Sequence, residues 1–238
     1  MAELKITTIY DNYEHDPRLQ TGWGFSCLVE VGDRKILFDT GADRTVELHN
    51  IEQLGIDLKG IEAVFLSHAH GDHTGGLSGV LEAASGPKVY LGRSFPRSLK
   101  DGVRRYGAEP VEVTGPMKLF ENIYSTGELG TMIKEQSMIV RIGQGLVVIT
   151  GCAHPGVVNI VKSAKEQLDE GIHLVIGGFH LGGLSDSKIE RIIADLKGLG
   201  VERAAPCHCS GERTRELFAE EYGDDYIANG VGNVIEIF

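Results

Sequence analysis

The sequence predicts an α/β fold in a single domain of residues 1–238. Two observations predict it. Short apolar runs of strand length alternate with segments of helical periodicity along the chain, and several of the strands end in polar loops that carry histidine. The hydrophobic fraction of 42% and the charged fraction of 24% are those of a globular protein rather than of a disordered or collagen-like chain. No Pro-rich or Ser-rich linker divides the chain, so we expect one compact domain whose halves each contribute a sheet.

In the first half, the predicted strands share runs of β-branched and aromatic residues. They are Leu4–Tyr10, Phe25–Val31, Lys35–Phe38, Ala63–Leu66 and Val89–Leu91. The predicted helices share apolar residues three or four positions apart, and they are Thr45–Leu54, which Gly55 ends, and Leu77–Ala84. From Arg93 to Gly107 we expect an irregular, basic stretch.

The second half repeats this order of elements. The predicted strands are Ser137–Ile142, Leu146–Ile149, His173–Ile176 and Val201–Ala205. The predicted helices are Val157–Leu168 and Ser187–Leu199. Loops that follow strands on an α/β framework are where ligand sites are normally found, so the histidine-bearing loops are the candidate site.

Three histidines and an aspartate lie within six residues, in the segment His68-Ala69-His70-Gly71-Asp72-His73. Because side chains two residues apart on an extended chain point the same way, His68 and His70 can share one metal ion. Asp72 and His73 can face a second position, and imidazole with carboxylate suits zinc, iron or manganese. The segment therefore predicts two adjacent metal sites. The alternatives are one structural metal ion and an exposed loop with a chance cluster of histidines.

Further ligands for a two-metal site are predicted at two other strand ends. His154 and His208 each follow a predicted strand, the alternative for each being a core histidine bonded to backbone carbonyls. Cys152 lies two residues before His154, so both side chains would face one way on an extended segment. Cys152 is either a bridging thiolate or a small buried hydrophobic residue.

Several motifs resemble those of one known family. Phe38-Asp39-Thr40-Gly41, the histidine segment and Thr74-Gly75-Gly76-Leu77 resemble the metallo-β-lactamase superfamily over nearly the whole chain. Three later motifs resemble its branch of archaeal dihydropterin ribofuranosyl-aminobenzene phosphate synthase and uncharacterised bacterial relatives: Thr150–Gly156, Gly177–Leu181 and Pro206–Gly211. The resemblance implies a four-layer αββα sandwich with metal ions in a cleft at one edge of the two sheets.

The resemblance also implies the ligand sets, with His68, His70 and His154 on one ion and Asp72, His73 and His208 on the other. Relatives bridge the ions with an aspartate in a Thr-Gly-Asp motif, where this chain has Cys152 after Thr150-Gly151. They also place a histidine earlier in a Pro-Gly-His motif, where this chain has Glu128 after Thr126-Gly127. Either Glu128 is a ligand or supports one, or His154 replaces the missing histidine. We favour His154.

Two divalent metal ions, zinc most simply, would make the chain a hydrolase, because a bound ion lowers the pKa of water from 15.7 to about 7. Asp72 would hold and orient the nucleophile, and Asp39 is placed to support a ligand histidine. His180 follows a predicted strand at the same edge, from which an imidazole can protonate a leaving oxygen. The alternative for His180 is a structural histidine in a glycine-rich turn.

The expected substrate is a small anionic molecule: an ester, a phosphodiester or a pterin-like compound. Arg104 and Arg105 lie in a locally basic stretch, and we predict that they clamp a phosphate or carboxylate, unless that stretch is only a solvated helix face. Two alternative functions fit the same metal site. The chain is then either an oxidoreductase with a di-iron centre or a ligand-binding protein that the metal stabilises. Iron in place of zinc or manganese would favour the oxidoreductase.

Other partners are excluded by composition. The formal charge of −11 opposes binding to nucleic acid, and no apolar run approaches the roughly 18 residues of a membrane helix. The N-terminus lacks a basic region followed by an apolar one, so we predict a cytoplasmic protein with four reduced cysteines.

Overall fold

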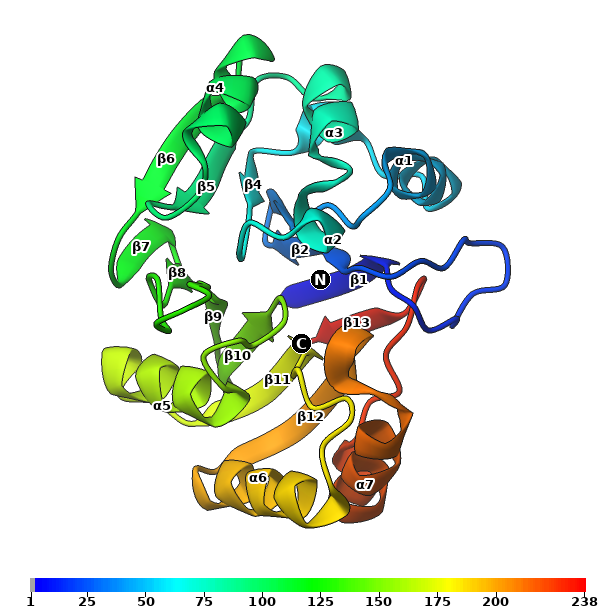
Figure 1. Cartoon of the computed structure of the whole chain (residues 1–238), viewed down its shortest axis with the longest axis vertical. Helices are drawn as coiled ribbons and strands as arrows, with labels where there is room; N and C mark the ends of the chain where they lie inside the picture. The colour runs from blue at the N-terminus through cyan, green and yellow to red at the C-terminus, as the bar shows by residue number, and fades with distance from the viewer. Residues whose placement is uncertain (1–2) are drawn as a thin grey trace. The chain divides into compact units, whose positions relative to one another are not determined.

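A computed structural model describes residues 3–238, which form two compact units (Figure 1). Unit 1 comprises the described residues up to Val113 together with Gly230–Phe238, and unit 2 comprises Thr114–Asn229. Each unit contains a mixed β-sheet with helices packed on it. The prediction that residues 1–238 make a single domain stays a prediction.

Within the described residues, the sheet of unit 1 has seven strands in the order β13-β1-β2-β3-β4-β5-β6. These strands are β1 (Leu4–Tyr10), β2 (Ser26–Val31), β3 (Arg34–Phe38), β4 (Ala63–Phe65), β5 (Lys88–Gly92), β6 (Glu109–Val113) and β13 (Val234–Ile237). The pairs along β13-β1-β2-β3 are antiparallel, whereas β3 to β6 run parallel. Because β3 and β4 are parallel neighbours, the loops that follow them begin side by side at one edge of the sheet.

Helices of unit 1 lie on its sheet through an apolar cluster. The helical segments are α1 (Arg44–Gln53), the short 3₁₀ turn Leu58–Gly60, α2 (Gly71–Thr74), α3 (Leu77–Ala83) and α4 (Arg97–Arg105). Side chains of α1, α3 and α4 join those of the central strands in one buried cluster, with Ile51, Val80 and Val103 among its members. The carboxylate of Asp43 caps α1 by accepting bonds from two backbone N–H groups in its first turn.

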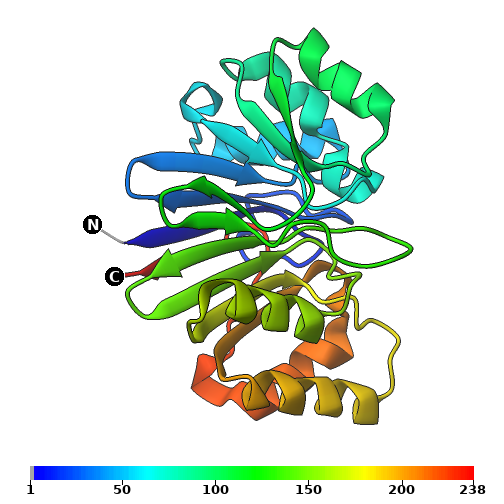
Figure 2. The ribbon, with the colours of Figure 1, turned by 90° about the vertical axis from the view of Figure 1, so that its left-hand side faces the viewer.

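Within the described residues, the sheet of unit 2 has six strands in the order β12-β11-β10-β9-β8-β7. They are β7 (Met117–Phe120), β8 (Ile123–Ser125), β9 (Met138–Ile142), β10 (Gly145–Thr150), β11 (Ile172–Gly178) and β12 (Val201–Cys207). The helical segments are α5 (Val157–Leu168), α6 (Asp186–Gly198), the 3₁₀ turn His208–Ser210, α7 (Glu212–Tyr222) and the 3₁₀ turn Gly223–Asp225. Residues of α5, α6 and α7 share one buried cluster with β9 to β12, and Figure 2 shows these helices on one face of the sheet.

The predicted elements agree with the structure to within one or two residues at most of their ends, and one prediction is wrong. The stretch from Arg93 to Gly107, expected to be irregular, contains α4. Its helical signal is Leu99 and Val103, four residues apart, which pack against the cluster of unit 1 while cations occupy the positions around them. The four cysteines are free, as predicted, and all four are buried. In residues 3–238 there is no helix with the length and apolar character that crossing a membrane requires.

Glu47, in the first turn of α1, is a buried carboxyl group. Ser26 Oγ lies 2.9 and 2.8 Å from its two oxygens, and burial raises the pKa of Glu47 from 4.5 to about 8. Between pH 4.5 and about pH 8, Glu47 is protonated in the folded chain, whereas in the unfolded chain it has released its proton. The contribution of Glu47 to stability is therefore greatest at low pH, and it falls by about 1.4 kcal/mol of unfolding free energy for each pH unit in this window.

We expect the Glu47→Gln variant to lose this dependence. Urea unfolding at pH 5 and at pH 8 should show a variant that is more stable than the wild type at pH 8 only, because glutamine stays neutral and still contacts Ser26. The exposed Glu52 lies on the same helix, so Glu52→Gln is the matched control. An equal difference between variant and wild type at both pH values contradicts the prediction.

Candidate metal centre

The histidine segment of unit 1 runs from the end of β4 into α2. The ring centroid of His68 is 4.6 Å from that of His70 and 4.3 Å from that of His73. His68 Nε2 and His70 Nδ1 are 3.1 Å apart. This is close to the roughly 3.3 Å that separates two nitrogens bound to one tetrahedral ion at about 2.0–2.1 Å. The two rings are close enough to share one ion, as predicted, and that they do so stays a prediction; both residues lie beyond the end of the strand.

Asp39, which follows β3, organises this segment. Its Oδ1 accepts a bond from Ser67 N at 2.7 Å and its Oδ2 one from Ser67 Oγ at 2.6 Å. The same Oδ2 lies 2.7 Å from His73 Nδ1, and Ser67 Oγ lies 3.0 Å from His68 Nδ1. Because the Ser67 hydroxyl donates its hydrogen bond to Asp39, it can only accept from His68. The Nδ1 of each imidazole therefore donates, and each Nε2 keeps its lone pair. As predicted, Asp39 supports a histidine of the segment.

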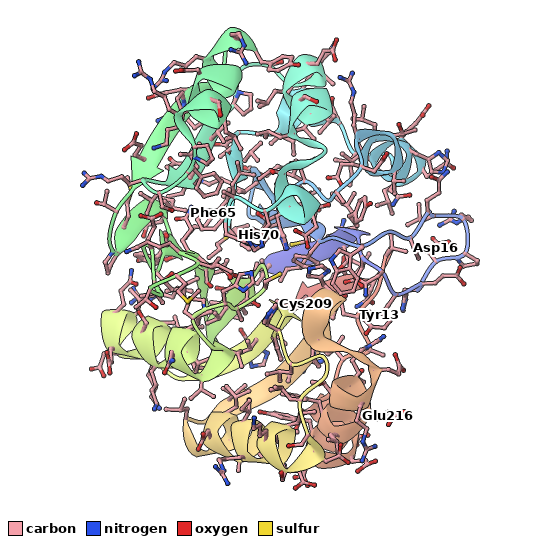
Figure 3. The ribbon with its side chains drawn as sticks, viewed as in Figure 1. Tyr13, Asp16, Phe65, His70, Cys209 and Glu216 are labelled. Carbon is pink, nitrogen blue, oxygen red and sulfur yellow. The ribbon has the colours of Figure 1, made fainter. Side chains whose placement is uncertain are left out.

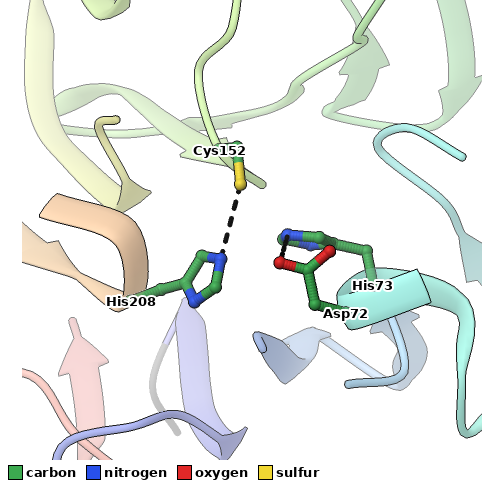
Figure 4. A group of neighbouring side chains, drawn as sticks. All are labelled: Asp72, His73, Cys152 and His208. Carbon is green, nitrogen blue, oxygen red and sulfur yellow. Dashed lines mark hydrogen bonds and ion pairs between the residues drawn. The ribbon is translucent and has the colours of Figure 1, made fainter. Parts of the chain in front are cut away.

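Asp72 is the half-buried carboxylate of the segment. Its Oδ2 lies 3.7 Å from His73 Nε2, a contact that Figure 4 marks with a dashed line. The same oxygen accepts a bond from Trp23 Nε1 at 3.1 Å, while 61% of Trp23 stays exposed. Unit 1 thus gathers three imidazoles and one carboxylate, a donor set that suits zinc, manganese or iron.

In unit 2, the loops that carry Cys152 and His208 lie at the same edge of the sheet. They follow β10 and β12, which flank β11 and run parallel to it. Cys152 Sγ lies 3.4 Å from His208 Nε2, and both residues are buried (Figure 4). Both interpretations of Cys152 require burial, so the choice between a bridging thiolate and a small buried hydrophobic residue stays a prediction.

Three residues of these loops adopt the left-handed backbone conformation without being glycine: Ala153 with φ 58°, His180 with φ 53° and His208 with φ 49°. This conformation costs on the order of 1–3 kcal/mol for each residue and persists only where the surrounding structure enforces it. Such strain gathers at functional sites. Here it marks the loops after β10, β11 and β12, which carry the donor atoms of unit 2.

Cys209 is a donor that the motif analysis did not single out (Figure 3). The candidate donor atoms of Cys152, His180 and Cys209 all lie within 4.8 Å of one another. Hydrogen bonding with Cys152, assisted by His180, lowers the pKa of Cys209 to about 4 despite its burial. Gly178 leaves room for the thiol, since a Cβ there would lie 2.7 Å from Cys209 Sγ. Unit 2 therefore offers thiolate as well as imidazole.

Glu135, also absent from the prediction, fixes the loop of Cys152 and His154. Its carboxylate is buried and accepts bonds from four successive backbone N–H groups. Oε1 receives those of Gly151, Cys152 and Ala153 at 3.1, 2.9 and 2.9 Å, and Oε2 receives that of His154 at 2.8 Å. No motif marks this residue, so only its place among buried neighbours reveals it.

His154 and His180 stand together in unit 2, with ring centroids 4.5 Å apart and planes inclined at 57°. Both rings line a hollow of about 610 Å³. His154 is half-buried and His180 is exposed. His180 therefore has the access to solvent that a proton donor needs, and its predicted role as one stays a prediction.

The remaining predicted residues are Arg104, Arg105 and Glu128. Arg104 lines a basic hollow with Lys100 and pairs with Asp101 at 2.8 Å, whereas Arg105 lines a different hollow beside α3. The two arginines therefore do not form one clamp, and phosphate binding by either stays a prediction. Glu128, the alternative ligand, is half-buried in the loop between β8 and β9.

The family model of the metallo-beta-lactamase superfamily matches residues 24–208. The chain belongs to the metallo-β-lactamase superfamily. It is 29% identical to the 7,8-dihydropterin-6-methyl-4-(beta-D-ribofuranosyl)-aminobenzene-5'-phosphate synthase of Methanocaldococcus jannaschii, over 98% of this chain and 96% of that protein. It resembles the solved structure of Tm1679, described as a metal-dependent hydrolase of the beta-lactamase superfamily, with a TM-score of 0.82 and 32% identity over 98% and 99% of the two chains. Zn²⁺-bound PqqB from Methylobacterium extorquens shares the fold at a TM-score of 0.64 and 14% identity, over 98% of this chain and 100% of that chain.

These comparisons confirm the predicted fold class, an α/β metallo-β-lactamase fold with two mixed sheets flanked by helices. They also confirm the predicted resemblance to the dihydropterin branch. Members of the superfamily are typically enzymes that bind divalent metal ions, and each unit holds residues suited to that role. The predicted ligand sets combine residues of both units, so the assignment of each ligand to an ion stays a prediction.

Proposed function

We propose that the chain is a metal-dependent hydrolase that acts on a small anionic ester, phosphodiester or pterin-like compound. One observation carries the proposal: the network from Asp39 through Ser67 to His68 and His73. It leaves two imidazoles in the tautomer that ligates a metal through Nε2, beside the carboxylate of Asp72. Buried titratable groups held in one network are typical of functional sites.

The donor sets fit two divalent metal ions. Zinc is a metal that binds every type of donor present. Unit 1 supplies imidazole and carboxylate, and unit 2 supplies imidazole and thiol, a combination that calcium and magnesium do not favour. The ligands we propose are those that the family resemblance implies: His68, His70 and His154 for one ion, Asp72, His73 and His208 for the other, and Cys152 at the bridging position.

Bound metal would supply hydroxide at neutral pH and stabilise negative charge on the substrate. Asp72 orients the attacking group with its half-buried carboxylate, whose Oδ2 contacts Trp23 and His73. His180, exposed at the hollow of unit 2, donates a proton to the leaving oxygen. Arg104 or Arg105 attracts the anionic group of the substrate.

The relatives narrow the substrate class. The Methanocaldococcus jannaschii relative is named as a synthase of a dihydropterin bearing a ribofuranosyl-aminobenzene phosphate, and Tm1679 is described as a metal-dependent hydrolase. We therefore propose a substrate that joins a flat heterocycle or aryl group to an anion. We also propose that the protein acts in the cytoplasm on free small molecules.

The test combines metal analysis with turnover. We expect protein purified without added metal to contain zinc and to hydrolyse para-nitrophenyl esters or phosphodiesters. Activity should be lost with a chelator and restored by zinc. The His70→Ala and His208→Ala variants should each show a lower ratio of metal to protein, whereas His15→Ala, at an exposed position of unit 1, should keep the wild-type ratio.

Other outcomes separate the alternatives. Full metal content and turnover in His70→Ala would falsify the site. Bound iron that cycles between two oxidation states would favour a di-iron oxidoreductase over a hydrolase. Metal retained without turnover of any of these esters or phosphodiesters would favour a metal-stabilised ligand-binding protein.

A further inference from the structure

The hollow of unit 2 beside His154 and His180 is mainly apolar. Its lining consists of the loop residues Leu129, Gly130, Thr131, Met132 and Ile133, together with His154, Pro155, Asn159 and His180. Lysine, arginine, aspartate and glutamate do not occur in this lining. Met132 is 96% exposed and Ile133 36% exposed. Exposed apolar side chains gathered at a concave site are typical of a surface that a ligand covers.

The loop that carries these side chains is fixed at its base. Leu129 and Glu135 exchange two backbone hydrogen bonds, at 2.8 and 3.1 Å. The buried carboxylate of Glu135 also binds the backbone of residues 151–154, which includes His154 on the other side of the hollow. Both walls therefore share one buried anchor. The base of the loop and residues 151–154 are thus fixed to each other, which lowers the entropy lost when a ligand binds between them.

The opposite wall offers flat faces. The rings of His154 and His180 are inclined at 57° with centroids 4.5 Å apart, and Pro155 lies beside them. Asn159 Nδ2 donates to Pro155 O at 2.8 Å, which leaves the Asn159 carbonyl as an acceptor at the rim. A methionine sulfur and the faces of two imidazoles favour aromatic rings over aliphatic groups of the same size.

We propose that this hollow binds an uncharged, planar aromatic ring of the substrate, with Met132 and Ile133 covering one face and the two imidazoles contacting the other. The ring is uncharged because the lining has no side chain of fixed charge to repay its desolvation. The inference rests on the proposed function only in taking the ring to be part of the hydrolysed molecule. In this proposal, Met132 and Ile133 are residues that determine which substrates the protein accepts.

Methionine methyl groups allow a direct test by nuclear magnetic resonance. The chain has four methionines, among which Met138 is buried in unit 2 and Met117 is half-buried on β7, so both are internal references. With isotope-labelled methionine in the full-length protein as purified, naphthylmethanol should shift the Met132 signal saturably through its ring current. Cyclohexylmethanol and inorganic phosphate should leave that signal within a tenth of the same change.

Variants then assign the contact. Ile133→Ala should raise the dissociation constant for naphthylmethanol by about three- to tenfold, because it removes apolar area on the order of 30–60 Å² from the contact. Val234→Ala changes an equally exposed apolar residue of unit 1 and should leave the constant unchanged. A Met132 signal that does not move, or that moves as much with cyclohexylmethanol, overturns the inference.

The measurement needs no turnover, so the two proposals fail separately. Saturable binding of the ring by a protein that hydrolyses nothing would contradict the proposed function and leave the hollow assigned. Zinc-dependent hydrolysis with no response at Met132 would support the proposed function and contradict the assignment of the hollow.

Discussion

Replacing Glu135 by alanine is expected to lower the free energy of unfolding by about 4 kcal/mol. The substitution deprives four buried N–H groups of a charged acceptor, and each group left unpaired costs about 1–3 kcal/mol where water does not replace the bond. All four bonds go to residues 151–154, so the loop of Cys152 and His154 loses its support. Urea unfolding followed by circular dichroism measures the change.

Two further variants identify the cause. Glu135→Gln keeps one carbonyl oxygen but turns an NH₂ group toward N–H donors, so we expect a loss between that of alanine and zero. Glu166→Gln, at an exposed position on α5, should change the unfolding free energy by less than about 0.5 kcal/mol. A loss below about 1 kcal/mol in Glu135→Ala would mean that the four bonds do not hold the loop.

The histidine segment of unit 1 could be predicted as a candidate site because its residues are close neighbours in the chain. The spacing of His68, His70 and His73 determines which donors share a face, whatever surrounds them. Asp39 could be predicted as well, since the strands β3 and β4 are parallel neighbours and their ends meet at one edge. Local spacing and one topological rule are enough for this part of the site.

Glu135 and Cys209 could not be predicted in the same way. Glu135 binds residues 16 to 19 positions further along the chain, and its neighbours carry no motif, so it looks like any surface acid until its burial is known. Cys209 faces Cys152, 57 positions earlier, because β10 and β12 both adjoin β11. Contacts of this kind depend on how loops close after the strands have paired.

The same reason explains why β13 was not predicted. β13 is a strand of only four residues, and it pairs with β1 near the other end of the chain, with Ile235 opposite Ile6. A strand so short is stabilised by its partner rather than by its own propensity. In α4, by contrast, the periodic signal was present, but Leu99 and Val103 are its only two strong apolar positions.

Asp39→Asn is expected to weaken metal binding by about 100-fold, at the upper end of the range for groups that orient metal ligands. Asparagine can still accept the bond from Ser67 N. Its NH₂ group, however, then faces Ser67 Oγ and His73 Nδ1, which lie 2.6 and 2.7 Å from Asp39 Oδ2 in the wild type. To accept a bond from this NH₂, His73 must move its proton to Nε2, and the nitrogen available to a metal ion is lost.

The affinity is measured by competition with a chromophoric zinc chelator, on protein whose folding is checked by circular dichroism. Asp43→Asn is the matched control, because Asp43 lies four residues away in the same unit and caps α1 instead of contacting a histidine. It should retain the wild-type affinity, since asparagine also caps helices. If Asp39→Asn folds and binds zinc as tightly as Asp43→Asn, then the orientation of His73 by Asp39 is irrelevant to metal binding. The observation that carries the proposed function would then have no consequence for a metal ion.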